Sequence, residues 1–287
     1  MTTLDVQSTL VPRLPPELER IIFEICASSQ MKSAVVLVRV AKRVHVWIQP
    51  VLYRVVIKAE AKLPPKYHTT SSLSVISYGP FVRHLLLGYS VSNTETIKFL
   101  SSCNHLRNLA LWTPNIGPHC LDWLDEMPLE RLSTNLSRLF TDLTPTTFLR
   151  PFFSQITHLE ITNTCSGWEK WCGLSILPSL THLALDFFFD PEVVEGCLIH
   201  CQKLKLLVLV YDSDTIMSSN LIGVLSVVRD PRVVPHCMVR EELKWEQSAW
   251  IWEDGPGRVG KGLDFWSLAE IVANQYTEYQ GLEVNPF

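Results

Sequence analysis

The strongest constraint on the fold of this chain is a short leucine pattern that returns six times at nearly constant spacing. The pattern is L-x-x-L-x-L, whose alternating apolar positions predict a short strand with one buried face. Successive fourth positions lie 24, 23, 27, 24 and 24 residues apart, and a weaker copy, VPHCMV, follows 30 residues later. Even spacing of this kind indicates a repeat architecture. The fourth positions are Leu85, Leu109, Leu132, Leu159, Leu183, Leu207 and Cys237.

The segments between the predicted strands are long enough for helices. Each holds about 18 residues, which suffices for a crossover between parallel strands. Several begin with helix-start signals: Ser92 stands three residues before Glu95, and Thr144 and Asp190 each precede a proline. One strand–helix unit cannot bury its apolar face alone, but a stack of such units can. Residues 79–239 are therefore predicted to form an α/β solenoid of parallel strands with outer helices.

This pattern resembles the leucine-rich repeat, which implies a curved parallel sheet with a concave inner face. The family usually has Asn or Cys three places after the last repeat leucine, and this chain does not. The solenoid is therefore expected to be irregular and degenerate. The residues at those places are Ser90, Pro114, Ser137, Thr164, Phe188 and Asp212.

A small helical module is predicted before the repeats. Residues 14–27 read LPPELERIIFEICA, in which two prolines open a helix and apolar residues recur at helical spacing from Leu18 to Ile25. Shorter helices are expected over 33–41 and 43–49, with Pro50 ending the second of these. The run VLYRVVI that follows is rich in β-branched residues and is typical of a strand.

Residues 12–57 resemble the F-box, in the variant found in fungal F-box-like proteins. In that family the module docks on a Skp-type adaptor of cullin–RING ubiquitin ligases, so the resemblance implies the adaptor, and through it cullin, as partners. The second helix departs from the usual pattern, because the expected tryptophan comes late, at Trp47. The motifs that carry the resemblance are Leu14-Pro15-x-Glu17-Leu18, Ile21-Ile22-Phe23 and Trp47-Ile48-x-Pro50-x-Leu52-Tyr53-Arg54. The adaptor-binding residues that it implies are Leu14, Pro15, Leu18, Ile21 and Ile22.

The expected order along the chain is the F-box-like module (12–57), a linker (58–78), the solenoid (79–239) and a C-terminal capping region (240–287). The capping region ends in an amphipathic helix near 264–276, with Phe265, Leu268, Ala269 and Val272 predicted on one face. Terminal repeats need such atypical covers.

The third position of each repeat predicts a strip of side chains on the concave face. These side chains point away from the leucine core, and equivalent positions stand about 4.8 Å apart on neighbouring strands. We expect them to face solvent and to contact a target protein, although the position can also simply tolerate hydrophilic residues. The third positions are His84, Asn108, Arg131, His158, His182, Leu206 and His236. The target-binding candidates are Trp112, Arg131, His158, Glu160, His182 and Asp186.

Composition argues against several function classes. The net charge of −4 shows no basic excess for nucleic-acid binding, and no apolar run reaches the ~18 residues of a membrane span. The N-terminus lacks a secretory signal, so a cytoplasmic or nuclear location is expected. Cys197-x-x-His200-Cys201 has no second ligand pair for zinc, and both cysteines are expected to face the core. No metal or cofactor is predicted.

No catalytic residues are predicted. The chain contains no G-x-S-x-G nucleophile motif. Residues 255–262 approach a phosphate-binding loop, but Gly262 stands where a magnesium-binding hydroxyl is needed, and too few residues follow for a nucleotide-binding sheet.

The function expected from these features is that of a substrate receptor of a Skp–cullin–F-box ubiquitin ligase, which is not itself an enzyme. The alternative is a leucine-rich-repeat interaction scaffold without ligase association. A remote alternative is a nucleotide-binding enzyme that uses residues 255–262.

Overall fold

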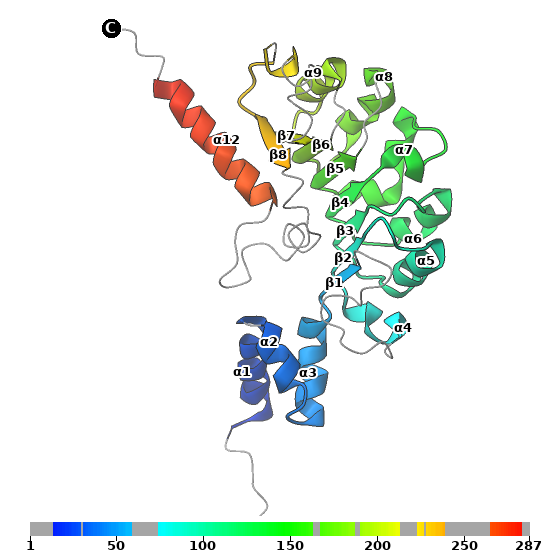
Figure 1. Ribbon diagram of the computed structural model, residues 1–287, viewed down its shortest axis with the longest axis vertical. Helices are drawn as coiled ribbons and strands as arrows, with labels where there is room; N and C mark the ends of the chain where they lie inside the picture. Colours follow the sequence, from blue (N-terminus) through cyan, green and yellow to red (C-terminus); the bar gives the residue numbers. More distant parts are fainter. Residues whose placement is uncertain are drawn as a thin grey trace, which may run out of the picture. The chain divides into compact units, whose positions relative to one another are not determined.

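The structure is a computed structural model that describes residues 14–29, 31–58, 74–162, 167–186, 190–212, 223–226, 228–238 and 265–282. The chain divides into two compact units between Tyr53 and Arg54. The first unit contains three helices, and the second contains the sheet and its associated helices (Figure 1).

The first unit packs α1 (Pro16–Ser29), α2 (Met31–Leu37) and α3 (Lys42–Leu52) against one another. Val44 and Ile48 of α3 are completely buried, as the helical spacing predicts. The predicted end at Pro50 is wrong, because α3 continues to Leu52. A proline this close to the end of a helix removes only one hydrogen bond, and the Tyr53 N–H still closes the last turn on the Gln49 carbonyl at 3.0 Å.

The second unit is built on an eight-stranded sheet in which every strand is parallel to its neighbours and the spatial order follows the sequence. This arrangement confirms the predicted α/β class with parallel strands. The strands are β1 (Val55–Lys58), β2 (His84–Leu87), β3 (Asn108–Leu111), β4 (Arg131–Thr134), β5 (His158–Thr162), β6 (His182–Asp186), β7 (Leu206–Asp212) and β8 (Val233–Met238).

The leucine pattern correctly predicts which side of the sheet is buried. The six fourth-position leucines, from Leu85 to Leu207, are each at most 1% exposed. They pair in register from β2 to β7, for example Leu159 with Leu183. Burial of a leucine in each strand from β2 to β7 contributes to the hydrophobic stabilisation of the stack.

Helices and 3-10 turns cover the leucine side of the sheet, on the outside of the curve that Figure 1 shows. The predicted capping box is present, with the Ser92 side chain accepting from the Glu95 N–H at 3.3 Å. The covering elements are α4 (Val75–Tyr78), η1 (Gly79–Phe81), α5 (Asn93–Ser102), η2 (Pro118–Cys120), α6 (Leu121–Asp125), α7 (Leu136–Leu139), η3 (Pro145–Leu149), η4 (Pro151–Gln155), α8 (Trp168–Trp171), η5 (Cys172–Ile176) and α9 (Pro191–His200).

The helix predicted after Thr144 is instead two short 3-10 helices, η3 and η4. Pro151 explains the break, because proline disfavours the helical conformation in the preceding residue. Arg150 accordingly adopts extended backbone, with φ −63° and ψ 145°.

The sheet is longer at its start than the sequence predicts. The run Val55–Lys58, expected to end the N-terminal module and begin a linker, is strand β1 and pairs with β2. Val56 stands opposite Leu85 and occupies the position of a repeat leucine. The sheet therefore begins at residue 55 rather than at 79.

The last strand has a different register from the one predicted. The VPHCMV copy predicts Cys237 opposite Leu207, but the sheet pairs Leu207 with Val233 and Tyr211 with Cys237. His236 consequently lies opposite Val210 instead of Leu206. The prediction is wrong by four residues, although His236 remains on the concave face of the sheet.

The C-terminal helix α12 (Phe265–Leu282) packs on β7 and β8. Phe265, Trp266 and Ala269 are buried against apolar side chains of the concave face. The predicted contact face is partly wrong, because Leu268 is 43% exposed and Trp266 takes its place. The other members of this apolar cluster are Ala184, Leu206, Val208, Val210 and Val234, with Val272 and Ala273 at its border.

Candidate interaction surfaces

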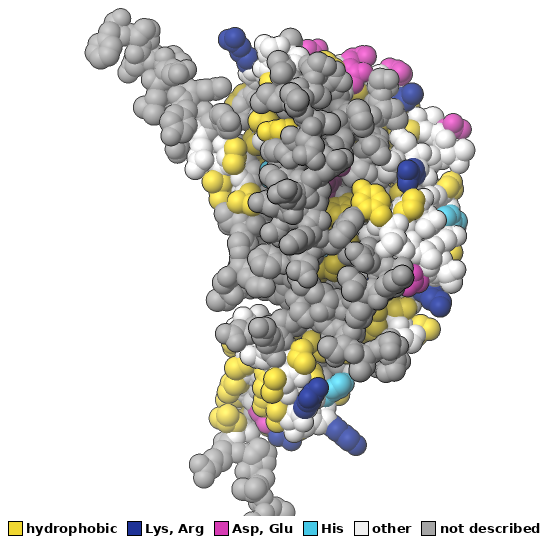
Figure 2. Space-filling view, viewed as in Figure 1, with side chains coloured by type: hydrophobic (Ala, Val, Ile, Leu, Met, Phe, Trp, Pro, Cys, Tyr) yellow, Lys and Arg dark blue, Asp and Glu magenta, His cyan; other side chains and the backbone are white. Residues whose placement is uncertain are grey.

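The first candidate surface is an apolar stripe on α1 and the two residues that precede it. We call it the α1 surface and define it as Leu14, Pro15, Leu18, Ile21 and Ile22, the five residues predicted to bind an adaptor. All five are exposed, and the four aliphatic side chains are 45–49% exposed. Figure 2 shows hydrophobic side chains gathered on this three-helix unit. Large apolar residues in a contiguous exposed patch mark protein-interaction sites.

The α1 surface faces outward because other residues of α1 hold the helix in its bundle. Glu19, Phe23 and Ala27 follow one another at four-residue spacing and form the inward line. Arg43 of α3 donates two hydrogen bonds to the Glu19 carboxylate, at 2.7 and 3.1 Å. The Phe23 and Trp47 rings lie 6.4 Å apart, and Ala27 is 1% exposed.

Sequence reasoning missed a further apolar group on the same unit. Val36 and Val40, in and just after α2, are 66% and 59% exposed. The sequence does indicate these exposed valines, since the segment AVVLVRV has more apolar residues than one helix face can bury.

The second candidate surface is the polar strip on the concave face. The sheet aligns His84, Asn108, Arg131, His158 and His182 in one row, as predicted. His158 and His182 stand side by side, with ring centroids 4.2 Å apart and ring planes 8° from parallel. Each imidazole Nδ1 is 2.8 Å from the hydroxyl of the threonine that precedes it.

The prediction that the whole strip faces solvent is wrong for three third positions, since Asn108, His182 and Leu206 are only 6%, 6% and 2% exposed. Helix α12 covers His182. The Trp266 ring meets both imidazoles edge-on, at 5.1 Å from His158 and 5.8 Å from His182. His182 Nε2 lies 2.9 Å from Glu270 Oε1. Part of the expected target strip is therefore an internal contact of the second unit.

The covering of His182 has an electrostatic consequence. Burial lowers the pKa of His182, because desolvation penalises the charged imidazolium. The Glu270 carboxylate opposes this shift, whereas Lys205 and Arg131 add to it. The net direction favours a neutral imidazole beneath α12.

Three side chains join across β4 next to the histidine pair. Trp112 Nε1 donates to Ser133 Oγ at 2.7 Å, and Ser133 stands opposite Glu160 in the sheet. Burial raises the pKa of Glu160, and its hydrogen bond with the Ser133 side chain partly offsets that shift. Trp112 follows β3 and thus lies two strands before β5.

The remaining two candidates also lie on this face. Arg131 is half-buried on β4, and Asp186 is 6% exposed at the end of β6. The polar strip thus lies between two apolar clusters: the one beneath α12, and a second formed by Val55, Ile57, Leu86 and Ala110 with Trp112 at its border.

The remaining predictions concern cysteines, a nucleotide-binding segment, metal ligands and membrane spans. Cys197 and Cys201 are buried, as expected. Residues 255–262, the segment of the nucleotide-binding alternative, lie outside the described residues. Among the residues that are described, no three His, Cys, Asp or Glu side chains gather as metal ligands would. Every helix in the described parts is too short or too polar to cross a membrane.

No protein-family model matches this chain, and a search of curated proteins finds no match to it.

Proposed function

We propose that this chain is the substrate receptor of a Skp–cullin–F-box ubiquitin ligase. The three-helix unit, residues 14–53, holds a Skp-type adaptor and through it cullin. The sheet unit holds a target protein. The chain catalyses nothing itself, and it acts by raising the effective concentration of the target near the transferring enzyme.

The observation that carries the proposal is the exposed α1 surface. Within its own unit, α1 is anchored by Glu19, Phe23 and Ala27, which lie on a different line of the helix from the apolar stripe. Its aliphatic residues stay available to a partner. An unpartnered apolar helix face is the kind of surface that docking modules use.

The target surface in this proposal is narrower than the full row of third positions. Helix α12 occupies the apolar part of the concave face at β6–β8. Trp112, Arg131 and Glu160 remain as target contacts on β3–β5. Aromatic and arginine side chains are the residue types that most often dominate binding energy at interfaces.

Affinity capture of the chain from its native cells tests the proposal, with the captured proteins probed for a Skp-type adaptor and for cullin. We expect both to be captured together with a target. The Arg131→Ala and Glu160→Gln variants should lose the target and keep the adaptor, because these residues belong to a different unit from the α1 surface.

A protein-interaction scaffold without ligase association is the rival. It predicts captured partners that depend on Arg131 and Glu160, with neither adaptor nor cullin among them. Recovery of such partners without the adaptor would favour the scaffold over the receptor.

A further inference from the structure

The concave face of β6–β8 carries an apolar surface that lies beneath α12. Strand β7 is buried on both sides, because its leucine side faces the core and its other side contacts α12. In Figure 1, α12 lies on the other side of the sheet from α5–α9. We call the covered surface the α12 site. Its residues are His182, Ala184, Leu206, Val208, Val210 and Val234.

Helix α12 contacts this site through side chains near its start. Phe265, Trp266 and Ala269 are at most 6% exposed, whereas the next residues, Glu270 and Ile271, are exposed. In the described residues, the hydrogen bond between α12 and the sheet is one of side chains, with His182 Nε2 2.9 Å from Glu270 Oε1. Residues 239–264 separate β8 from α12 in the chain. The contact therefore has the form of an amphipathic helix bound to an apolar surface.

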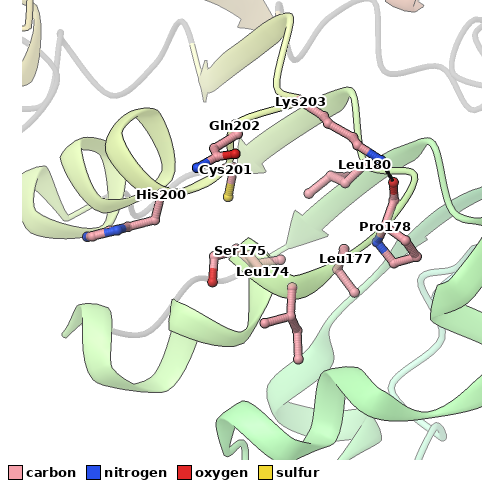
Figure 3. Close-up of a pocket in the computed structure, with 10 residues that line it drawn as sticks. Leu174, Ser175, Leu177, Pro178, Leu180, His200, Cys201, Gln202 and Lys203 are labelled. Carbon is pink, nitrogen blue, oxygen red and sulfur yellow. Dashed lines mark hydrogen bonds between the residues drawn. The ribbon is translucent and has the colours of Figure 1, made fainter.

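A pocket elsewhere on the sheet unit provides control residues. It has a volume of about 380 Å³ and lies between η5 and the end of α9, among the elements that cover the leucine side (Figure 3). Its lining includes Leu177, Leu180, Gln202 and Lys203. Lys203 Nζ donates to the Pro178 carbonyl at 2.5 Å. Substitutions in this pocket should not affect the α12 site.

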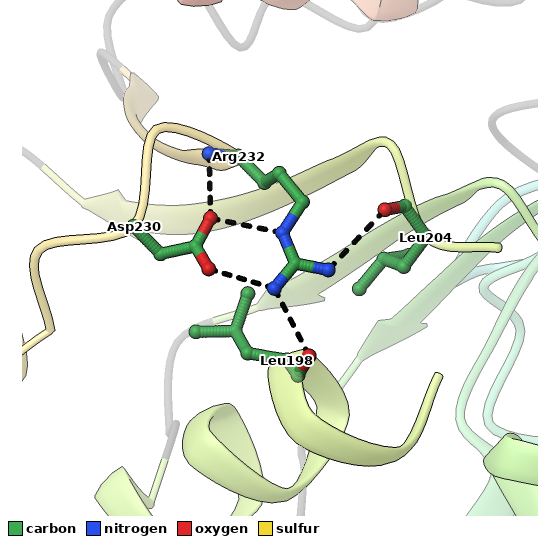
Figure 4. Close-up of polar contacts among 4 residues, drawn as sticks. All are labelled: Leu198, Leu204, Asp230 and Arg232. Carbon is green, nitrogen blue, oxygen red and sulfur yellow. Dashed lines mark hydrogen bonds and ion pairs between the residues drawn. The ribbon is translucent and has the colours of Figure 1, made fainter. Parts of the chain in front are cut away.

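Strand β8 is tied to the rest of the sheet by contacts that do not involve α12. The Arg232 guanidinium is held by Asp230 at 2.7 and 2.9 Å, and it donates to the Leu198 carbonyl at 3.0 Å and the Leu204 carbonyl at 3.5 Å (Figure 4). The Arg232 carbonyl accepts a hydrogen bond from the Leu207 N–H at 2.8 Å. Departure of α12 should therefore uncover the α12 site and leave β8 in the sheet.

Four residues of α12 indicate which kind of helix the site accepts. Phe265 and Ala269 are four residues apart, as are Trp266 and Glu270, so the four lie side by side on one part of the helix surface. The aromatic rings supply apolar contact area. Ala269 is small and lets the helix lie close to the sheet, and Glu270 meets His182.

We propose that the target protein docks on the α12 site through a helix with two adjacent aromatic residues followed one turn later by a small residue and a carboxylate, and that α12 occupies the site until this helix displaces it. This docking mode rests on the proposed function, because it names the segment of the target that the receptor binds. Arg131 stands opposite His158, and Glu160 opposite Ala184. A helix on the α12 site is thus next to both of these proposed target contacts.

A labelled peptide of residues 265–282, added to the full-length chain and followed by fluorescence anisotropy, tests the proposal. In the unaltered chain, α12 competes with the peptide and lowers its apparent affinity by the fraction of sites that are open. Trp266→Ala weakens the competing helix, so this chain should bind the peptide at least about tenfold more tightly. Equal affinities, or no binding by the Trp266→Ala chain while β3–β5 keep slow hydrogen exchange, would overturn the proposal.

Glu270→Ala repeats the test without altering the buried cluster, because the Glu270 side chain is half-exposed. It should also bind the peptide more tightly than the unaltered chain, by a smaller factor than Trp266→Ala. Gln202→Ala, in the pocket of Figure 3, is the control and should bind as the unaltered chain does. No gain from Glu270→Ala, or an equal gain from Gln202→Ala, would contradict displacement of α12.

Two altered peptides test the chemistry of the partner helix. One keeps Phe265, Trp266, Ala269 and Glu270 and has Ala, Lys or Gln at the other positions, and it should still bind the Trp266→Ala chain. The other has Ala in place of Trp266 alone and should not bind. The opposite result with either peptide would contradict the stated kind of helix.

Titration of the same chains with a Skp-type adaptor separates this docking mode from the proposed function. Adaptor binding without peptide binding would overturn the α12 site as a docking site and leave the receptor function standing. Peptide binding in the expected order without adaptor binding would support the α12 site as a helix-binding surface and contradict the receptor function.

Discussion

Glu19, Phe23 and Ala27 hold α1 in its bundle along one line, while the aliphatic residues of the same helix lie on another. Because packing in the bundle uses one line of residues, the other line is left exposed. An ion pair, a ring contact and a small buried residue join α1 to its bundle. Leu18, Ile21 and Ile22 lie on the other line and stay exposed, as the proposed adaptor docking requires.

Leu183 is the residue that tests the leucine core. It is completely buried in β6 between Leu159 and Leu207. We expect Leu183→Ala to lower the free energy of unfolding by about 2–5 kcal/mol, because a cavity replaces a packed side chain. Chemical unfolding of the full chain measures this.

Leu149→Ala is the matched control for Leu183→Ala, since the Leu149 side chain is 69% exposed. Its effect should be within about 0.5 kcal/mol. Similar effects of the two substitutions would show that the leucine row is not the core.

His182 predicts a pH dependence of stability. Its pKa in the folded chain is lower than the ordinary value of about 6.5, so the unfolded chain binds more protons as the pH falls below that value. The stability that the neutral imidazole contributes is fully present above about pH 6.5 and is lost as the pH falls through the folded pKa.

Chemical unfolding at pH 7.5 and at 5.5 checks this expectation, with His182→Gln as the comparison. The unaltered chain should lose more stability on acidification than the variant does. The variant should still show some loss, because burial also lowers the pKa of His236. An equal loss in both chains would mean that His182 does not contribute.

Among the secondary-structure elements, α12 changes the expected picture most. It places Trp266 against both histidines and seals the apolar cluster of β6–β8. Replacing Trp112, His158 and His182 together therefore alters stability as well as any target contact, contrary to the expectation for solvent-facing side chains.

Trp266→Ala should release α12 from the sheet. Truncation of a buried tryptophan costs about 3–5 kcal/mol. Trp266 is one of three α12 side chains buried in the apolar cluster, so its loss should weaken the packing of the helix on the sheet. Hydrogen exchange of residues 265–275 should speed up, while exchange in β3–β5 stays slow. Leu268→Ala, on the exposed side of the same helix, should leave hydrogen exchange in both regions unchanged. Fast exchange of β3–β5 in the Trp266 variant would contradict the expectation that α12 can detach while the sheet stays folded.

The local pattern predicted much of the sheet, but not its two ends. Alternating leucines place β2–β7 in register because every strand carries the same buried positions. Strand β1 has Val56 and Lys58 at the positions of the repeat leucines, and it lies 29 residues before the next copy, counted from Val56 to Leu85, so it does not stand out as a repeat. Strand β8 likewise has no leucine to set its register.

The candidate site was predictable only in part, and for a similar reason. Strand alternation predicts which face His158 and His182 share, and their stacking follows from the register. It does not predict what covers that face. The contact between His182 and Glu270 joins residues 88 positions apart, and no periodicity within one element encodes such a pairing.

In the molecule as a whole, two separate units carry two separate surfaces. The α1 surface belongs to residues 14–53, and the polar strip belongs to the sheet unit. A receptor that joins an adaptor to a target requires this separation, because each surface must be occupied without displacing the other. Substitutions on one unit should therefore leave binding at the other unchanged.

Titration calorimetry of the purified full-length chain with a purified Skp-type adaptor tests adaptor docking on the α1 surface. We expect saturable binding that Ile22→Asp abolishes, because the substitution buries an unpaired charge in the docked complex. Ile76→Asp is the matched control, since Ile76 lies on α4 of the sheet unit and is 74% exposed. It should bind the adaptor as the unaltered chain does. Absence of adaptor binding, or equal binding by the Ile22→Asp chain with its helix content unchanged, would contradict adaptor docking on α1.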